Sequence, residues 1–174
     1  MLFRSVVEND VTVTAEYPNG ATGVFVTCTH DPVGTDRLEI DLDNGKIVVE
    51  NSKKATILRF KKTEDEMNAT MTMHQVSRLV MGGGADQMYD TETFENTDGW
   101  GTQHCQVMTN FAAHILDGTP LLAPGSDGIC GVQLANAVLL SGWLGKEVDV
   151  PVDEDVYVQE LNKRIAEEGK FPTR

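Results

Sequence analysis

The side chains best suited to chemistry lie in one short segment, where Thr29, His30 and Asp31 follow one another. Together they offer a hydroxyl, an imidazole and a carboxylate, a mixture suited to hydrogen-bonding a sugar or polyol. Farther along the chain, Trp100 could stack on a sugar face and His104 could donate to a hydroxyl. We take these five residues as candidate substrate ligands. The alternatives are a solvated surface loop for the first three and an ordinary helix start with a packed tryptophan for the other two.

A metal or Cys–His site is the weaker hypothesis, because the histidines and cysteines lack paired spacing such as H-x-x-x-H. Such a site would have to draw on His30, Asp31, His104 and Cys105. The three cysteines form no C-x-x-C pair, which argues against a disulfide framework or a zinc clip. We therefore expect three reduced thiols, at least one of them in the core, and no metal or catalytic residue in this chain.

Charge and hydropathy exclude several classes of partner. The 27 acidic residues against 14 basic ones give a formal charge of -13, which repels nucleic-acid phosphates and anionic membranes. No run approaches the roughly 20 apolar residues that span a bilayer, and the first residues lack the apolar core of a secretory signal. We expect a cytoplasmic protein without nucleic-acid or membrane partners.

The first third of the chain alternates apolar and polar residues with the period of β-strands. Strands are predicted at residues 11–17, 21–29, 37–42, 47–50 and 55–62. Pro18, Asn19 and Gly20 supply turn chemistry for the first hairpin, and Asn44-Gly45 favours a tight two-residue turn in the second. Five strands joined in this way predict one antiparallel meander.

The rest of the chain changes character. Residues 63–101 show no clean period and predict long connections around one or two short strands. Helical spacing then predicts three helices and, between the last two, a short strand. Their ranges are 104–117 and 126–144 for the first two helices, 148–152 for the strand and 153–168 for the last helix. Ser126 or Asp127 is the expected N-cap of the second helix.

Strands followed by helices indicate an α+β fold, with an open, mainly antiparallel sheet and helices on one of its faces. The strands carry more β-branched apolar surface than one covered face requires, and a large exposed apolar face usually meets a partner. The residues concerned are Val24, Val26, Ile47, Val48 and Val49. We expect the uncovered face to make a homo-oligomer.

Four segments together resemble the C-terminal domain of the Gfo/Idh/MocA oxidoreductases, named for glucose-fructose oxidoreductase, inositol dehydrogenase and a rhizopine-catabolism protein. They read DVTVTAEYPNGATGVFV, THDPVGTDRLEI, DNGKIVVE and HCQVMTNFAAHILDGTPLLAPGSDGICGVQLANAVLLSGWLGKEVDVPVDED. The order and spacing carry the resemblance, since no single motif is diagnostic. It implies a substrate domain that closes against NAD or NADP held by a separate Rossmann domain, in dimers or tetramers formed by sheet packing.

Three motifs that the resemblance implies have no match: the G-x-G-x-x-G fingerprint, a Glu-Lys-Pro and a D-x-x-x-H. The glycine run at residues 82–84 follows no predicted strand and indicates a flexible loop. Asn110 and His114 have the D-x-x-x-H spacing with the wrong first residue, and a surface or helix-packing histidine is the simpler interpretation.

We therefore expect one domain over residues 1–174, without a Rossmann domain, a bound cofactor or activity of its own. It would be the substrate-binding and oligomerisation part of an NAD(P)-dependent oxidoreductase acting on a sugar, polyol or related hydroxy compound. The alternative is a non-catalytic self-associating or ligand-binding protein that lost the Rossmann half.

Overall fold

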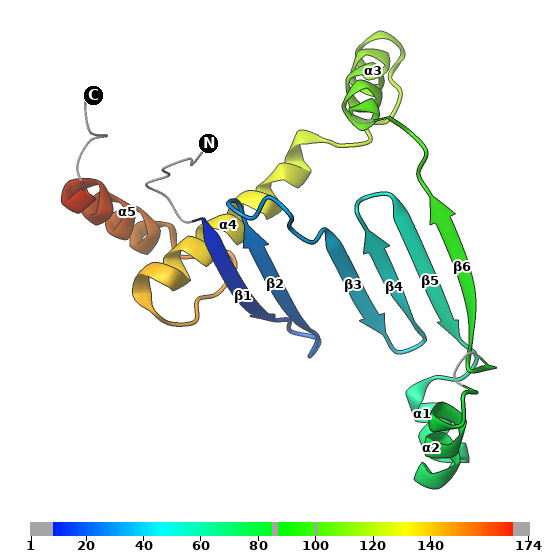
Figure 1. The fold of residues 1–174 in the computed structure, drawn as a ribbon. Helices are drawn as coiled ribbons and strands as arrows, with labels where there is room; N and C mark the ends of the chain where they lie inside the picture. The colour runs from blue at the N-terminus through cyan, green and yellow to red at the C-terminus, as the bar shows by residue number, and fades with distance from the viewer. Residues whose placement is uncertain (1–8, 85–86, 100, 169–174) are drawn as a thin grey trace. The chain divides into compact units, whose positions relative to one another are not determined.

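The computed structural model describes residues 9–84, 87–99 and 101–168 and has an α+β composition (Figure 1). The chain divides into two compact units, one made of residues 1–11 and 26–99 and the other of residues 12–25 and 100–174. Each unit is described by itself. The first holds an antiparallel sheet with two short helices, and the second holds the longer helices.

The strands form two sheets, so the prediction of a single five-stranded meander is wrong. A two-stranded sheet pairs β1 (Asp10–Glu16) with β2 (Thr22–Cys28). A four-stranded antiparallel sheet has the order β3-β4-β5-β6. Its strands are β3 (Arg37–Leu42), β4 (Gly45–Glu50), β5 (Lys54–Phe60) and β6 (Tyr89–Glu95). A connection of eight residues separates β2 from β3, too long for a tight hairpin to force their pairing.

Turn chemistry explains the hairpins, with one correction. Gly20 has φ 87° in the β1–β2 turn, as the Asn-Gly pair predicts. In the β3–β4 hairpin, however, Gly45 is a strand residue opposite Leu42, and the loop is Asp43-Asn44. Glycine is needed there for another reason, because a Cβ would collide with the carbonyl oxygen of Leu58 on β5.

Residues 63–101 fold more than their sequence period indicates. They contain α1 (Glu64–Thr70) and α2 (Met73–Met81) ahead of β6. The prediction that this segment consists of long connections around one or two short strands was therefore wrong. Each helix begins with a capping box, in which a threonine side chain and the third helical residue bond each other's backbone N–H. The pairs are Thr63 with Glu66 and Thr72 with Gln75.

In the second unit the predicted helices form, and the predicted strand does not. The helices are α3 (Thr102–Asp117), α4 (Gly128–Leu144) and α5 (Glu154–Glu168), with the 3-10 turn η2 (Gly125–Asp127) before α4. Residues 148–152 have no strand partner and contain a cis Val150–Pro151 bond. Asp127 stands at the N-cap of α4, but its side chain accepts no capping bond from a helix N–H, whereas Asp153 accepts one from Val156 N–H at 3.0 Å and caps α5.

The buried core of the described residues is small. Val48 is the buried apolar side chain of the first unit, and Ala137 and Leu140 are those of the second. Trp143 on α4 stacks on Tyr157 of α5, with ring centroids 5.6 Å apart. All three cysteines are exposed, so the expectation of a cysteine in the core is wrong.

Candidate functional site

The segment after β2 holds three of the predicted site residues, and two of them make local structural bonds. Thr29 N–H donates to the Asn9 carbonyl at 2.9 Å, and its hydroxyl donates to Asn9 Oδ1 at 3.1 Å. Asp31 Oδ1 accepts a bond from Val33 N–H at 2.9 Å, closing an Asx turn. These bonds fix the loop and leave the His30 ring exposed beside them.

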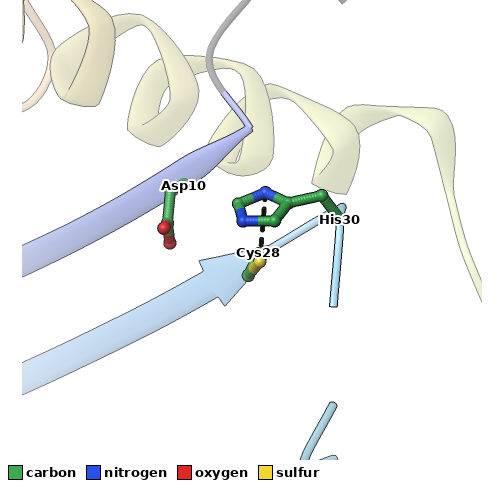
Figure 2. A group of neighbouring side chains, drawn as sticks. All are labelled: Asp10, Cys28 and His30. Carbon is green, nitrogen blue, oxygen red and sulfur yellow. Dashed lines mark hydrogen bonds between the residues drawn. The ribbon is translucent and has the colours of Figure 1, made fainter. Parts of the chain in front are cut away.

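His30 lies against two residues that sequence reasoning did not combine with it. Its Nδ1 is 3.5 Å from Cys28 Sγ, and Asp10, Cys28 and His30 each offer a ligand atom within 4.8 Å of the others. Figure 2 shows the His30 ring over the cysteine sulfur, with Asp10 on the neighbouring strand. The cluster can exchange hydrogen bonds with a polar molecule or offer sulfur, nitrogen and oxygen to a cation.

Of the other two predicted site residues, Trp100 and His104, the structure describes one. Trp100 lies outside the described residues. His104 is exposed in the first turn of α3, where its backbone N–H donates to the Gly101 carbonyl at 3.0 Å. It belongs to the second compact unit, whereas Thr29, His30 and Asp31 belong to the first.

Asn110 and His114 have structural partners at the end of α3. Asn110 donates to the Pro120 carbonyl and accepts from Leu122 N–H, both at 2.9 Å. His114 Nδ1 lies 2.8 Å from the Thr119 carbonyl. Both side chains thus fasten the segment that follows Gly118, in agreement with the helix-packing interpretation of this pair.

The four-stranded sheet presents two faces of opposite character. Successive residues of a strand point to opposite faces, and the register fixes which residues share one. We call one the apolar face. Its apolar residues are Leu38, Ile40, Leu42, Ile47, Val49, Ala55, Ile57 and Phe94, and at the β5–β6 end it also carries the charged Arg59, Asp90 and Glu92. Leu38 on β3 is 50 % exposed and Phe94 on β6 55 %, so the two short helices of this unit leave the face largely uncovered.

We call the other side the ion-paired face. Lys46 Nζ lies 2.6 Å from Glu39 and 3.3 Å from Asp41, and Arg37 bridges Glu39 and Glu50. The pKa of Glu39 is held below its ordinary value, chiefly by the hydrogen bond from Lys46 and then by that from Arg37. Val48 belongs to this face, opposite Glu39, and not to the apolar surface where we expected it. Leu58, Phe60 and Tyr89 share this face with it.

An open hollow of about 400 Å³ lies at one end of the apolar face. Val49, Ala55 and Phe94 contribute its apolar wall. Polar residues of the neighbouring turn and strand ends form its rim. A hollow of this kind suits the insertion of an apolar side chain from a partner better than the enclosure of a polar substrate.

The comparison with protein families decides the assignment. Residues 4–150 match the family model described as the oxidoreductase family, C-terminal alpha/beta domain, of the Gfo/Idh/MocA group. The chain belongs to this family. No curated protein matches it. Among the described helices, none is both long and apolar enough to cross a bilayer.

Membership of the Gfo/Idh/MocA family confirms the resemblance and the α+β class. The family is one of NAD(P)-dependent oxidoreductases, and this chain corresponds to its C-terminal domain. In the cluster of Asp10, Cys28 and His30, His30 was a predicted site residue and Asp10 was not. The available signal was the first hairpin itself, since its turn at residues 18–20 places Asp10 opposite Cys28.

Proposed function

We propose that this Gfo/Idh/MocA domain is the substrate-binding and oligomerisation part of an NAD(P)-dependent oxidoreductase that acts on a sugar, polyol or related hydroxy compound. The observation that carries the proposal is the apolar face of the four-stranded sheet. Its central strands β4 and β5 bear Ile47, Val49, Ala55 and Ile57, none of them fully buried in the single chain. A second copy of the same face is the occupant that fits it best.

Three features favour a second copy. The face is built of regular antiparallel strands, and two such sheets pack with their inner side chains interdigitated about 10 Å apart. A two-fold arrangement closes the assembly without leaving another apolar surface. Charged pairs border the face at the β5–β6 end, where Arg59 lies 3.2 Å from Glu92 and Lys61 3.4 Å from Asp90, as in the polar rim of an interface.

Sedimentation velocity of the whole chain over a micromolar concentration series tests the oligomeric part. We expect a dimer or larger species whose fraction grows with concentration. A clean monomer over the accessible range would contradict it.

Substrate contact is the second part of the proposal, and Thr29, His30, Asp31, Trp100 and His104 are its candidate residues. The exposed ring of His30, held beside a loop fixed by its own backbone bonds, supports it. In a full-length oxidoreductase carrying this domain, His30→Ala or His104→Ala should lower kcat/KM about 2- to 12-fold, the value of one lost hydrogen bond. Unchanged kinetics in both variants would remove these histidines from the proposed substrate site.

In this proposal the separate Rossmann domain, and not this domain, binds the NAD or NADP cofactor. The sequence has no G-x-G-x-x-G turn, whose backbone N–H groups hold the pyrophosphate of a dinucleotide. Calorimetric titration of the chain with NADH or NADPH should therefore give no saturable binding tighter than roughly 100 μM. Tighter binding would require a cofactor site within this domain.

A further inference from the structure

The geometry of the first hairpin brings Asp10, Cys28 and His30 together by a simple rule. Thr29 N–H bonds to the Asn9 carbonyl, so the next residue back along β2, Cys28, lies opposite Asp10 on β1. Directly opposed residues project from the same face with Cβ atoms roughly 5 Å apart. His30 lies in the bend that follows β2, with its ring nitrogen 3.5 Å from Cys28 Sγ. The strand pairing and this bend thus bring together a carboxylate, a thiol and an imidazole.

The distances fit the coordination of a small cation. Sulfur at about 2.3 Å and nitrogen at about 2.0–2.1 Å from a tetrahedral zinc ion lie roughly 3.5 Å apart. The distance from Cys28 Sγ to His30 Nδ1 is 3.5 Å. The Asp10 oxygen lies within 4.8 Å of both atoms, and its exposed side chain has room to close the remaining gap by rotation about its χ angles.

The types of ligand select the metal. A thiolate with an imidazole suits zinc or a similar borderline ion, whereas calcium and magnesium prefer oxygen ligands alone. Three protein ligands leave the fourth tetrahedral position to water or to a substrate atom, the pattern of open zinc sites. The formal charge of -13 also raises the local concentration of cations.

We propose that Asp10, Cys28 and His30 form a binding site for Zn²⁺ or a chemically similar divalent cation. Binding forms metal–oxygen, metal–sulfur and metal–nitrogen bonds and releases the thiol proton to solvent. Affinity therefore falls as the pH falls, because protons compete for the sulfur and the imidazole. The inference does not rest on the apolar face of the four-stranded sheet, but it shares His30 with the proposed substrate contacts, and the metal titrations test it without any substrate.

Cobalt(II) is the first probe, because it occupies zinc sites and reports its ligands in its absorption spectrum. The chain is reduced, freed of metal and titrated with Co²⁺. We expect one equivalent to produce the thiolate-to-cobalt charge-transfer band and the visible bands of a tetrahedral site, and Zn²⁺ to abolish both. Absorption of octahedral cobalt without a charge-transfer band, as expected for scattered carboxylates, would overturn the proposal.

Matched variants assign the ligands. Cys28→Ser should abolish the charge-transfer band. Asp10→Asn and His30→Gln each remove a direct ligand and should each weaken Zn²⁺ binding by more than the loss of an outer-shell partner does, which is roughly 10- to 100-fold. Cys105→Ser and Cys130→Ser replace exposed cysteines of α3 and α4 and should leave the spectrum unchanged. Loss of the band in either control, or its retention in Cys28→Ser, would contradict the assignment, with circular dichroism verifying that each variant is folded.

Discussion

The two faces of the four-stranded sheet use the same strands for opposite purposes. On β3, Leu38, Ile40 and Leu42 point to one side, while Arg37, Glu39 and Asp41 point to the other. The charged residues find partners within the sheet, but the apolar ones stay about half exposed. The charged groups of β3 are therefore paired within the sheet, whereas its apolar side chains need a further surface to leave water.

The largest expected difference between the faces is in stability after truncation. Ile57→Ala removes a side chain from the centre of the apolar face and should cost about 2–5 kcal/mol of unfolding free energy once a second copy covers that face. Thr56→Ala, the neighbouring residue of β5 on the ion-paired face, should cost below about 1 kcal/mol. Urea unfolding at one protein concentration measures both, and equal losses would remove the distinction between the faces.

A smaller loss is expected when both faces are disturbed together. In Gly45→Ala the new Cβ meets the Leu58 carbonyl and strains the β4–β5 pairing on which both faces depend. We expect a loss of about 1–3 kcal/mol, typical of overpacking. Gly128→Ala is the control, because its Cβ meets nothing within 4 Å, and it should be neutral or stabilising by up to about 1 kcal/mol. Thermal unfolding compares the two, and similar melting temperatures would argue against the close β4–β5 approach.

The smallest effect belongs to the ion pairs and depends on pH. The pKa of Glu39 in the folded chain is lowered by its bonds from Lys46 and Arg37, so its charged form stabilises the fold above the unfolded-state pKa. That stabilisation is lost as the pH falls through the folded-state pKa. Glu39→Gln should therefore lose less stability than the wild type on acidification, by a small margin because these pairs are solvent-exposed. Identical pH profiles would show that the pairs contribute nothing.

The sequence predicted those parts of the fold in which local pattern and tertiary structure agree. Alternation located β1 to β5, and helical spacing located α3 to α5, because each of these patterns is the repeat of the element that forms. The helices α1 and α2 were missed because they are short, at seven and nine residues, and so few turns give little repetition of a helical period. Their capping boxes were nevertheless recognisable in the sequence, as a threonine followed three residues later by glutamate or glutamine.

The candidate site was predictable only in part. His30 stood out by residue type, but its neighbours come from strand pairing, which a search for short spacings does not detect. Whether β2 pairs with β3 could not be determined either, because a connection of that length does not force pairing. The sequence also did not show which residues share a face of the sheet. Ile47, Val48 and Val49 are three consecutive apolar residues, and only the strand register assigns each of them to a face.

The most direct test of the account is a pair of lysine substitutions on opposite faces, measured by sedimentation velocity. Ile40 and Thr93 lie on the two edge strands and are exposed, so a lysine at either position can keep its ammonium group in water and the fold intact. We predict that Ile40→Lys shifts the protein to a monomer and that Thr93→Lys leaves the assembly unchanged. Assembly that survives Ile40→Lys, or is lost equally in both variants, would contradict association through the apolar face.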